Sequence, residues 1–262
     1  MAATLNRENY FSPDMMRRYC SVSQFKAFRD CEAAGLAEVE GKYTPRQTEG
    51  MLLGSYMDSL FEDPNGTAFF AEHPDCMKRN GEPKAEFQAV RRIFDRVTRD
   101  RMFKKYTMGE QQVVMTGIIA DVPVKIMIDS YLPGRAIVDR KLMADLKPKF
   151  DPKTEQRVPW FAYWGYDVQA AVYQEIVRQN TGERLPFYLA PMTKTDPTQY
   201  DLILMPDDIT EKTLEEFEEY VPRIEAIKIG AIVPERCEEC AFCLETKMLT
   251  EPSNANEYYF DI

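Results

Sequence analysis

The stretch IMIDSYLPGRAIVDRK, residues 126–141, decides the fold, because two runs of apolar residues each lead to charged side chains. Pro133-Gly134 separates the runs, as is typical of a tight turn, so the stretch predicts a hairpin of two core strands. Such a hairpin would bring Asp129, at the end of the first strand, beside Asp139 on the second. Alternate residues of a strand share a face, so Lys141 would point to the same place as Asp139.

Two carboxylates and an ammonium group at one place indicate a metal-dependent hydrolytic site. Hard divalent cations such as Mg²⁺ take oxygen ligands and keep several waters, so Asp129 and Asp139 with a backbone carbonyl suit an open metal site. A metal held there would lower the pKa of bound water and neutralise phosphate charge, as phosphodiester hydrolysis requires. The alternative is an exposed sheet edge that carries charged residues. The apolar neighbours of both aspartates favour the catalytic interpretation.

Working outward from the hairpin, the apolar spacing predicts helices before it and a helix, strands and a further helix after it. In chain order we expect helices at 23–40, 49–62 and 84–105, a β meander at 111–142, a loop at 144–159, a helix at about 164–177, strands at 185–192 and 198–205, and an acidic helix at 210–229. This order predicts an α/β fold, in which a mixed central β-sheet is flanked by helices.

The length of 262 residues favours a single domain. We expect a helical N-terminal part at about 1–108, a core at about 109–206, and a C-terminal helix with a cysteine segment at about 207–262.

The overall charge argues against a general nucleic-acid-coating surface. The net charge is -10, so any contact with DNA must be local. A local basic patch, or equally a solvated helix face, is formed by Arg91, Arg92, Arg96, Arg99, Arg101, Lys104 and Lys105. No stretch reaches the roughly 20 apolar residues of a membrane span, and the N-terminus lacks the apolar core of a signal peptide. We therefore expect a cytoplasmic protein without a membrane partner.

The hairpin stretch, followed by WGYDVQAAVYQ at 164–174, resembles the PD-(D/E)XK nuclease superfamily, and within it the RecB/RecE-like and phage-type recombination exonucleases. The segments SVSQFKAFRDCEAA at 21–34 and GSYMDSLFE at 54–62 resemble the same group, so the likeness covers most of the chain. It implies a restriction-endonuclease-like core. It also implies that Asp129, Asp139 and Lys141 bind metal and activate water.

The resemblance implies roles for further residues. Gln169 and Tyr173, one helical turn apart, match the glutamine and tyrosine that steer the active site and DNA. Asp58 stands where many relatives have a histidine and would be a metal ligand, and Glu110 matches an acidic position of some relatives. His73 is the single histidine of the chain, which excludes Ser-His-Asp triads and histidine-rich zinc sites.

The resemblance therefore predicts a DNA exonuclease that uses Mg²⁺ or Mn²⁺. It implies digestion from duplex ends in phage-type recombination, a single-strand annealing protein as partner, and a homo-oligomer. One alternative is a CRISPR-associated or repair-type nuclease of the same fold that acts on single strands. Another alternative is a non-catalytic module that binds DNA ends or proteins. Arg140 and Leu142 favour this alternative, because relatives usually have other residue types at these two positions.

Cys237, Cys240 and Cys243 form the most specific local motif, Cys-x-x-Cys-x-x-Cys. Three thiols at this spacing can surround one metal or cluster, and a fourth ligand must come from elsewhere. Some nucleases of the resembling family hold an iron–sulfur cluster with one cysteine before the core and three after it. That likeness implies Cys31 as the fourth ligand of a [4Fe-4S] cluster. Zn²⁺ and unligated reduced thiols are the alternatives.

Overall fold

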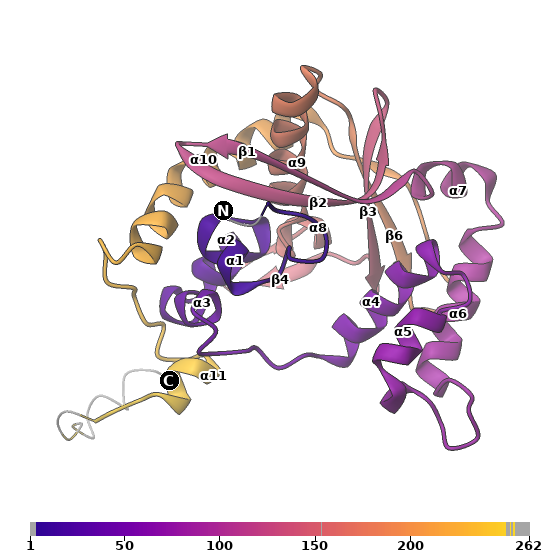
Figure 1. The fold of residues 1–262 in the computed structure, drawn as a ribbon, viewed down its shortest axis with the longest axis horizontal. Helices are drawn as coiled ribbons and strands as arrows, with labels where there is room; N and C mark the ends of the chain where they lie inside the picture. Colours follow the sequence, from indigo (N-terminus) through magenta and orange to yellow (C-terminus); the bar gives the residue numbers. More distant parts are fainter. Residues whose placement is uncertain (1–3, 153, 250–251, 253, 255–262) are drawn as a thin grey trace.

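A five-stranded mixed sheet with helices on both faces forms the centre of the computed structural model (Figure 1), which describes residues 4–152, 154–249, 252 and 254. The strand order is β1-β2-β3-β6-β7. The strands are β1 (Glu110–Ile119), β2 (Val122–Leu132), β3 (Ala136–Met143), β6 (Phe187–Thr193) and β7 (Ile203–Leu204). This architecture confirms the predicted α/β fold with a mixed central sheet flanked by helices.

The first three strands are the predicted antiparallel meander. β1 and β2 pair along their whole length and are joined at Ala120 and Asp121, whose φ angles of 47° and 63° give the left-handed conformation of a tight hairpin turn. β2 and β3 pair over a short stretch only, from Leu132↔Ala136 to Ser130↔Val138. Beyond that point the ladder ends, and β3 continues as a parallel partner of β6.

Two groups of helices cover the sheet (Figure 1). One face packs against α2, α9 and α10, and the other packs against α4, α6 and α7. The helices of the first group, with their neighbours, are α1 (Pro13–Arg18), α2 (Val22–Asp30), α3 (Glu32–Val39), α8 (Trp160–Tyr163), α9 (Tyr166–Thr181), α10 (Asp207–Lys228) and α11 (Ala241–Glu245). The second group consists of α4 (Glu49–Glu62), α5 (Thr67–Glu72), the short 3₁₀ helix η1 (Pro74–Cys76), α6 (Ala85–Val97) and α7 (Arg101–Thr107).

The alternation of side chains along β3 places charged groups on both faces of the sheet. Ile137 packs into the core beneath α9, whereas Ala136 and Val138 pack toward α4 and α6. With a period of two, Asp139 and Lys141 follow Ile137 toward α9. Arg140 follows Val138 to the opposite face.

Two predicted helices are each divided into two, which corrects the sequence interpretation. The expected helix 23–40 breaks at Cys31, whose φ of -162° and ψ of 113° are extended, so α2 and α3 are separate. The expected helix 84–105 breaks after Val97, and the Asp100 carboxylate caps α7 by accepting from the N–H groups of Met102 and Phe103. Helical periodicity continued across both breaks, which is why the sequence did not reveal them.

The predicted strand pattern also needs two corrections. The expected loop 144–159 contains a small hairpin of β4 (Lys149–Asp151) and β5 (Gln156–Val158). The expected strand 198–205 is regular only over the two residues of β7, with an isolated bridge between Tyr200 and Met192. The helices predicted at 49–62, about 164–177 and 210–229 are present as α4, α9 and α10.

Glu32 joins the N-terminal helices to the C-terminal part of the chain. Its carboxylate accepts from Arg223 Nε at 2.6 Å, from the Tyr220 hydroxyl at 2.8 Å and from the Glu235 N–H at 2.8 Å. The predicted division into three parts remains a prediction, and most of the polar tail after residue 249 lies outside the described residues. Within the residues that the structure describes, no helix is both long and apolar enough to cross a membrane.

Candidate functional site

Asp139 and Lys141 form an ion pair at the point where β3 leaves its partner β2. Asp139 is only 2% exposed, and its Oδ1 lies 2.6 Å from Lys141 Nζ. Its Oδ2 accepts a hydrogen bond from Gln169 Nε2 at 2.5 Å. The side chain of Asp139 is therefore held from its own strand and from α9, in a single orientation.

Asp129 lies beside this pair, as the hairpin predicted. Its Oδ2 accepts from the backbone N–H of Arg140 at 2.9 Å, and its Oδ1 accepts from Gln112 Nε2 at 3.4 Å. Gln112 has a left-handed φ of 52°, an uncommon conformation for a residue with a side chain. The irregularity of β1 at this point places an amide group opposite Asp129.

The electrostatics of Asp139 and Lys141 follow from burial and from their neighbours. Burial raises the pKa of Asp139 to about 6, Lys141 opposes the rise, and the negative charge of Asp129 adds to it. Burial alone would lower the pKa of Lys141, but the two aspartates hold it above its usual value. Lys141 is therefore a cation throughout the physiological range, in direct contact with the Asp139 carboxylate.

Asp58 reaches the same region from α4, where it pairs with Arg140. Arg140 Nε lies 3.3 Å from Asp58 Oδ1, and Nη1 donates to the Thr107 carbonyl at 2.9 Å and to Gln111 Oε1 at 2.6 Å. The guanidinium also lies 4.2 Å from the centre of the Phe61 ring. Burial and the nearby charge of Asp129 raise the pKa of Asp58 to about 7. Asp58 thus lies close to the two hairpin carboxylates, although an arginine is its direct partner.

The other residues predicted for the site are placed differently. Tyr173 is buried on α9 and donates its hydroxyl to the carbonyl of Met127 at 3.1 Å, so it ties α9 to β2. Burial raises its pKa well above the usual value, which keeps the hydroxyl protonated. Glu110 is exposed at the start of β1. The neighbouring Gln111 and Gln112, rather than Glu110, contact the charged residues of the centre.

Three residues at the centre, Arg140, Tyr166 and Lys26, were not predicted as site residues from the sequence. Arg140 is 3% exposed. Its position on a core strand could have indicated a role at the centre, because a charged residue on the second face of such a strand needs a partner. Tyr166 has two ammonium groups over its ring, Lys141 Nζ at 4.7 Å and Lys26 Nζ at 4.9 Å from the centroid. No spacing in the sequence connects Lys26 of α2 with Tyr166 of α9.

The carboxylates of Asp129, Asp139 and Asp58 offer the oxygen donors that a hard divalent cation prefers, although they are not gathered as closely as the sulfurs of the four-cysteine group described below. All of their donor atoms are oxygens, and burial together with mutual repulsion raises the pKa of two of them, so a cation would relieve that repulsion. Asp129 and Asp139 come from the diverging strands, and Asp58 comes from α4. These residues could hold Mg²⁺ or Mn²⁺ beside Lys141.

Cys31, Cys237, Cys240 and Cys243 meet at a second site. Their sulfur atoms all lie within 4.8 Å of one another. Cys243 Sγ lies 3.5 Å from Cys31 Sγ and 3.9 Å from Cys237 Sγ. The backbone N–H groups of Cys240 and Cys243 point to the sulfurs of Cys237 and Cys240, at 3.3 and 3.4 Å. The helix break at Cys31 is what directs its side chain to the other three.

The spacing of these sulfurs matches one tetrahedral ion. With a Zn–S bond of about 2.3 Å, tetrahedral geometry separates the sulfurs by roughly 3.8 Å. A four-iron cluster has an inorganic cube between its cysteines and would hold the thiolates further apart. The four cysteines could therefore hold a single zinc-type ion at this spacing, whereas the iron–sulfur cluster implied by the resemblance would require the sulfurs to lie further apart.

The chain is similar to known proteins in sequence and in fold. A family model described as a PDDEXK-like domain of unknown function (DUF3799) matches residues 21–246. A solved structure from Eubacterium rectale, provisionally named an exonuclease, is 38% identical, with all of each chain covered and a TM-score of 0.93. A second solved structure, SSO0001, shares 12% identity over 76% of this chain and 86% of its own, and its TM-score of 0.28 is too low to indicate a common fold. No curated protein matches the chain.

Proposed function

The chain belongs to the PDDEXK-like family, and its fold is of the restriction-endonuclease-like type; from that premise we propose that it is a metal-dependent deoxyribonuclease that hydrolyses DNA phosphodiester bonds. The observation that carries the proposal is the contact of Lys141 Nζ with Asp139 Oδ1, beside Asp129. A lysine and two carboxylates at the end of a diverging strand pair are the groups that phosphodiester hydrolysis requires.

Each side chain has a separate part in the proposed reaction. Asp129 and Asp139, with Asp58, would hold Mg²⁺ or Mn²⁺, which supplies a water of lowered pKa and neutralises phosphate charge when bound. Lys141 is fixed within hydrogen-bond distance of Asp139, so its ammonium can orient the attacking water and stabilise charge on the phosphate. Gln169 holds the second oxygen of Asp139 and fixes its orientation.

We further propose that the deoxyribonuclease is an exonuclease. This proposal is supported by the relative from Eubacterium rectale that is provisionally named an exonuclease. Four further properties remain predictions that rest on the resemblance and the composition. They are digestion from duplex ends in phage-type recombination, an annealing partner, a homo-oligomeric state and a cytoplasmic location. Glu110 and Tyr173 remain predicted site residues, although Tyr173 contacts the backbone of Met127.

An assay with DNA of different topology tests the activity and separates the alternatives. Linear duplex, nicked circular duplex, linear single-stranded and circular single-stranded DNA are each incubated with the protein and Mg²⁺. A duplex-end exonuclease degrades only the linear duplex. A repair-type or CRISPR-associated single-strand nuclease degrades the single-stranded circle, if it acts internally, or single-stranded linear DNA. A non-catalytic binding module degrades none of them, and that result would overturn the proposed function.

We further propose that Cys31, Cys237, Cys240 and Cys243 bind one Zn²⁺ ion, in place of the [4Fe-4S] cluster that the resemblance implied. The close approach of the four sulfurs supports this ion. The site lies beside the network in which Glu32 joins α3 to α10, so its role is to stabilise the fold.

A further inference from the structure

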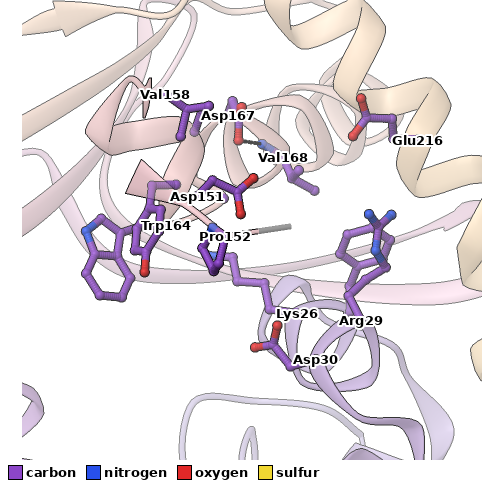
Figure 2. A pocket seen from close by; sticks show the side chains of 14 residues that line it. Lys26, Arg29, Asp30, Asp151, Pro152, Val158, Trp164, Asp167, Val168 and Glu216 are labelled. Atoms are coloured by element: carbon purple, nitrogen blue, oxygen red, sulfur yellow. Dashed lines mark hydrogen bonds between the residues drawn. The ribbon is translucent and has the colours of Figure 1, made fainter. Parts of the chain in front are cut away.

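A cavity of about 550 Å³ lies next to the proposed catalytic centre. Residues of α2 form one wall, α8 and the start of α9 form another, and the β4–β5 hairpin closes the side. Figure 2 shows Lys26 and Arg29 of α2 facing Asp167 of α9, with Trp164 at one end and Glu216 at the other. This volume lies in the range of cavities that bind small molecules or nucleotides.

Tyr166 contacts both Lys26 of the cavity lining and Lys141 of the catalytic centre. Lys141 Nζ lies 4.7 Å from the centre of its ring and Lys26 Nζ lies 4.9 Å from it, so one ring is shared by a residue of the catalytic centre and a residue of the cavity. Lys26 passes directly over Gly165, where a Cβ atom would come within 3.0 Å of Lys26 Cε. Gly165 has a left-handed φ of 61°, so its lack of a side chain serves both the turn and the position of Lys26.

The walls of the cavity suit a flat aromatic ligand. Trp164 and Tyr163 remain 46% and 40% exposed, and their rings meet edge to face with centroids 5.0 Å apart. Phe25, Val158 and Val168 supply apolar surface. Exposed aromatic rings beside a cavity form a platform on which any nucleobase can stack.

The charges of the lining select a base rather than a phosphate chain. The lining contains the two cations Lys26 and Arg29 and four carboxylates, a net charge of 2 − 4 = −2. Carboxylates repel phosphates but accept hydrogen bonds from exocyclic amino groups of bases. The four carboxylates belong to Asp30, Asp151, Asp167 and Glu216. A phosphate would therefore stay at the edge near Lys26, while a neutral base enters.

We propose that this cavity binds the unpaired terminal nucleotide of the DNA strand that is being cleaved. The base stacks on Trp164, and Lys26 binds the phosphate between that nucleotide and the catalytic centre. The inference rests on the proposed nuclease function and names its substrate more closely, as a single-stranded or frayed end. A base within a closed duplex cannot reach the cavity, because its faces are covered by its neighbours.

Binding of a short fluorescently labelled oligodeoxycytidylate in buffer without Mg²⁺ or Mn²⁺ tests the proposal without hydrolysis. We expect Trp164→Ala to weaken binding about tenfold, the effect of losing one stacked base. Trp164→Phe keeps a ring and should retain most of the affinity. Phe11→Ala is the matched control, because Phe11 is an exposed aromatic residue outside the cavity lining. Lys26→Gln should reduce the slope of log affinity against log salt by about 0.7, the share of one phosphate contact on a single strand.

Tryptophan fluorescence gives an independent readout on the unmodified protein. The chain has two tryptophans, of which Trp160 is buried and Trp164 is exposed. The oligonucleotide should quench the emission of the wild type but not that of Trp164→Phe, and an oligonucleotide with abasic ends should bind less tightly and quench less. Equal affinity of Trp164→Ala and the wild type, or equal quenching by abasic ends, would overturn the cavity proposal even if Mg²⁺-dependent hydrolysis is found. Conversely, quenching without any hydrolysis would reject only the nuclease function.

Discussion

The carboxylate of Asp129 accepts a hydrogen bond from the backbone N–H of Arg140 at 2.9 Å, where a strand partner would otherwise accept it. The β2–β3 ladder ends at Ser130↔Val138, one residue from Asp129 and two residues from Arg140. The side chain therefore satisfies a backbone donor that the divergence of the strands leaves open. The same hydrogen bond fixes Asp129 beside Asp139, so the end of the ladder creates the site.

Gln169→Ala should lower kcat/KM about 10- to 100-fold, the usual effect of removing a group that orients a metal ligand. The reason is the loss of the 2.5 Å hydrogen bond to Asp139 Oδ2. Gln174→Ala is the matched control on the same helix, since Gln174 Nε2 donates to the Leu185 carbonyl away from the centre. Steady-state hydrolysis with Mg²⁺ should separate the two variants, and equal rates in both would contradict the role of Gln169.

Asp58→Ala should affect both stability and activity, because Asp58 pairs with the buried guanidinium of Arg140. Without added Mg²⁺ or Mn²⁺, a double-mutant cycle with Arg140→Met should give a coupling free energy of about 1 kcal/mol in urea unfolding. Loss of hydrolysis in Asp58→Asn, with little change in unfolding, would add a role as metal ligand. A coupling energy near zero would show that the ion pair contributes nothing to the fold.

The sequence predicted the hairpin and the position of its acidic residues because neighbouring residues determine both the turn and the alternation of side chains along the strands. Pro133-Gly134 and the alternation of apolar residues specify the turn and the strands, and the period of two assigns Asp139 and Lys141 to one face. The partner of Arg140 could not be predicted in the same way. It lies on α4, 82 residues earlier in the chain, and only the packing of α4 on the sheet brings Asp58 to it.

The break at Cys31 shows a second limit of prediction from periodicity. Apolar residues continue at helical spacing through residue 31, yet the backbone there is extended and the sulfur meets three others from more than 200 residues away. The tertiary contact overrides the local preference. The cavity at Tyr166 was not predictable for the same reason, since its walls come from α2, α9 and the β4–β5 hairpin.

Metal analysis of the purified protein should find one zinc per chain and no stoichiometric iron or sulfide. Cys31→Ser should lose the zinc and lower the Tm by roughly 10 °C, which corresponds to a few kcal/mol for a chain of this size. Cys76→Ser is the control, because Cys76 is buried in the group formed by α4, α5 and α6, apart from the four-cysteine site. Iron and sulfide in equal amounts would instead restore the iron–sulfur interpretation.

The free energy of unfolding at alkaline pH should depend on the protonation of the buried Lys125. Burial, with the nearby charge of Lys228, lowers its pKa from 10.5 to about 8, although its ammonium donates to the Tyr10 carbonyl. The unfolded chain therefore binds more protons than the folded one between about pH 8 and 10.5, so this residue makes the free energy of unfolding rise with pH in that window. Lys125→Met should remove this contribution. Lys212→Met, at an exposed position of α10, should not.

The pH dependence is measured as the difference between variant and wild type in urea unfolding at several pH values within the window. Comparing differences cancels the contributions of groups that titrate there without contacting Lys125, whereas Cys20 and Tyr10 interact with Lys125 and belong to its contribution. Parallel curves for Lys125→Met and the wild type would contradict a lowered pKa of Lys125.

The most direct test of the catalytic centre is the rate of Mg²⁺-dependent hydrolysis of DNA by Lys141→Met and Asp139→Asn, compared with the wild type and with Asp121→Asn. Asp121 lies in the β1–β2 turn, so its variant should hydrolyse DNA at the wild-type rate. Lys141→Met should be slower by at least about a hundredfold, and Asp139→Asn should be inactive, while both remain folded. Hydrolysis at the wild-type rate by either of these two variants, with Mg²⁺ present, would contradict the central claim.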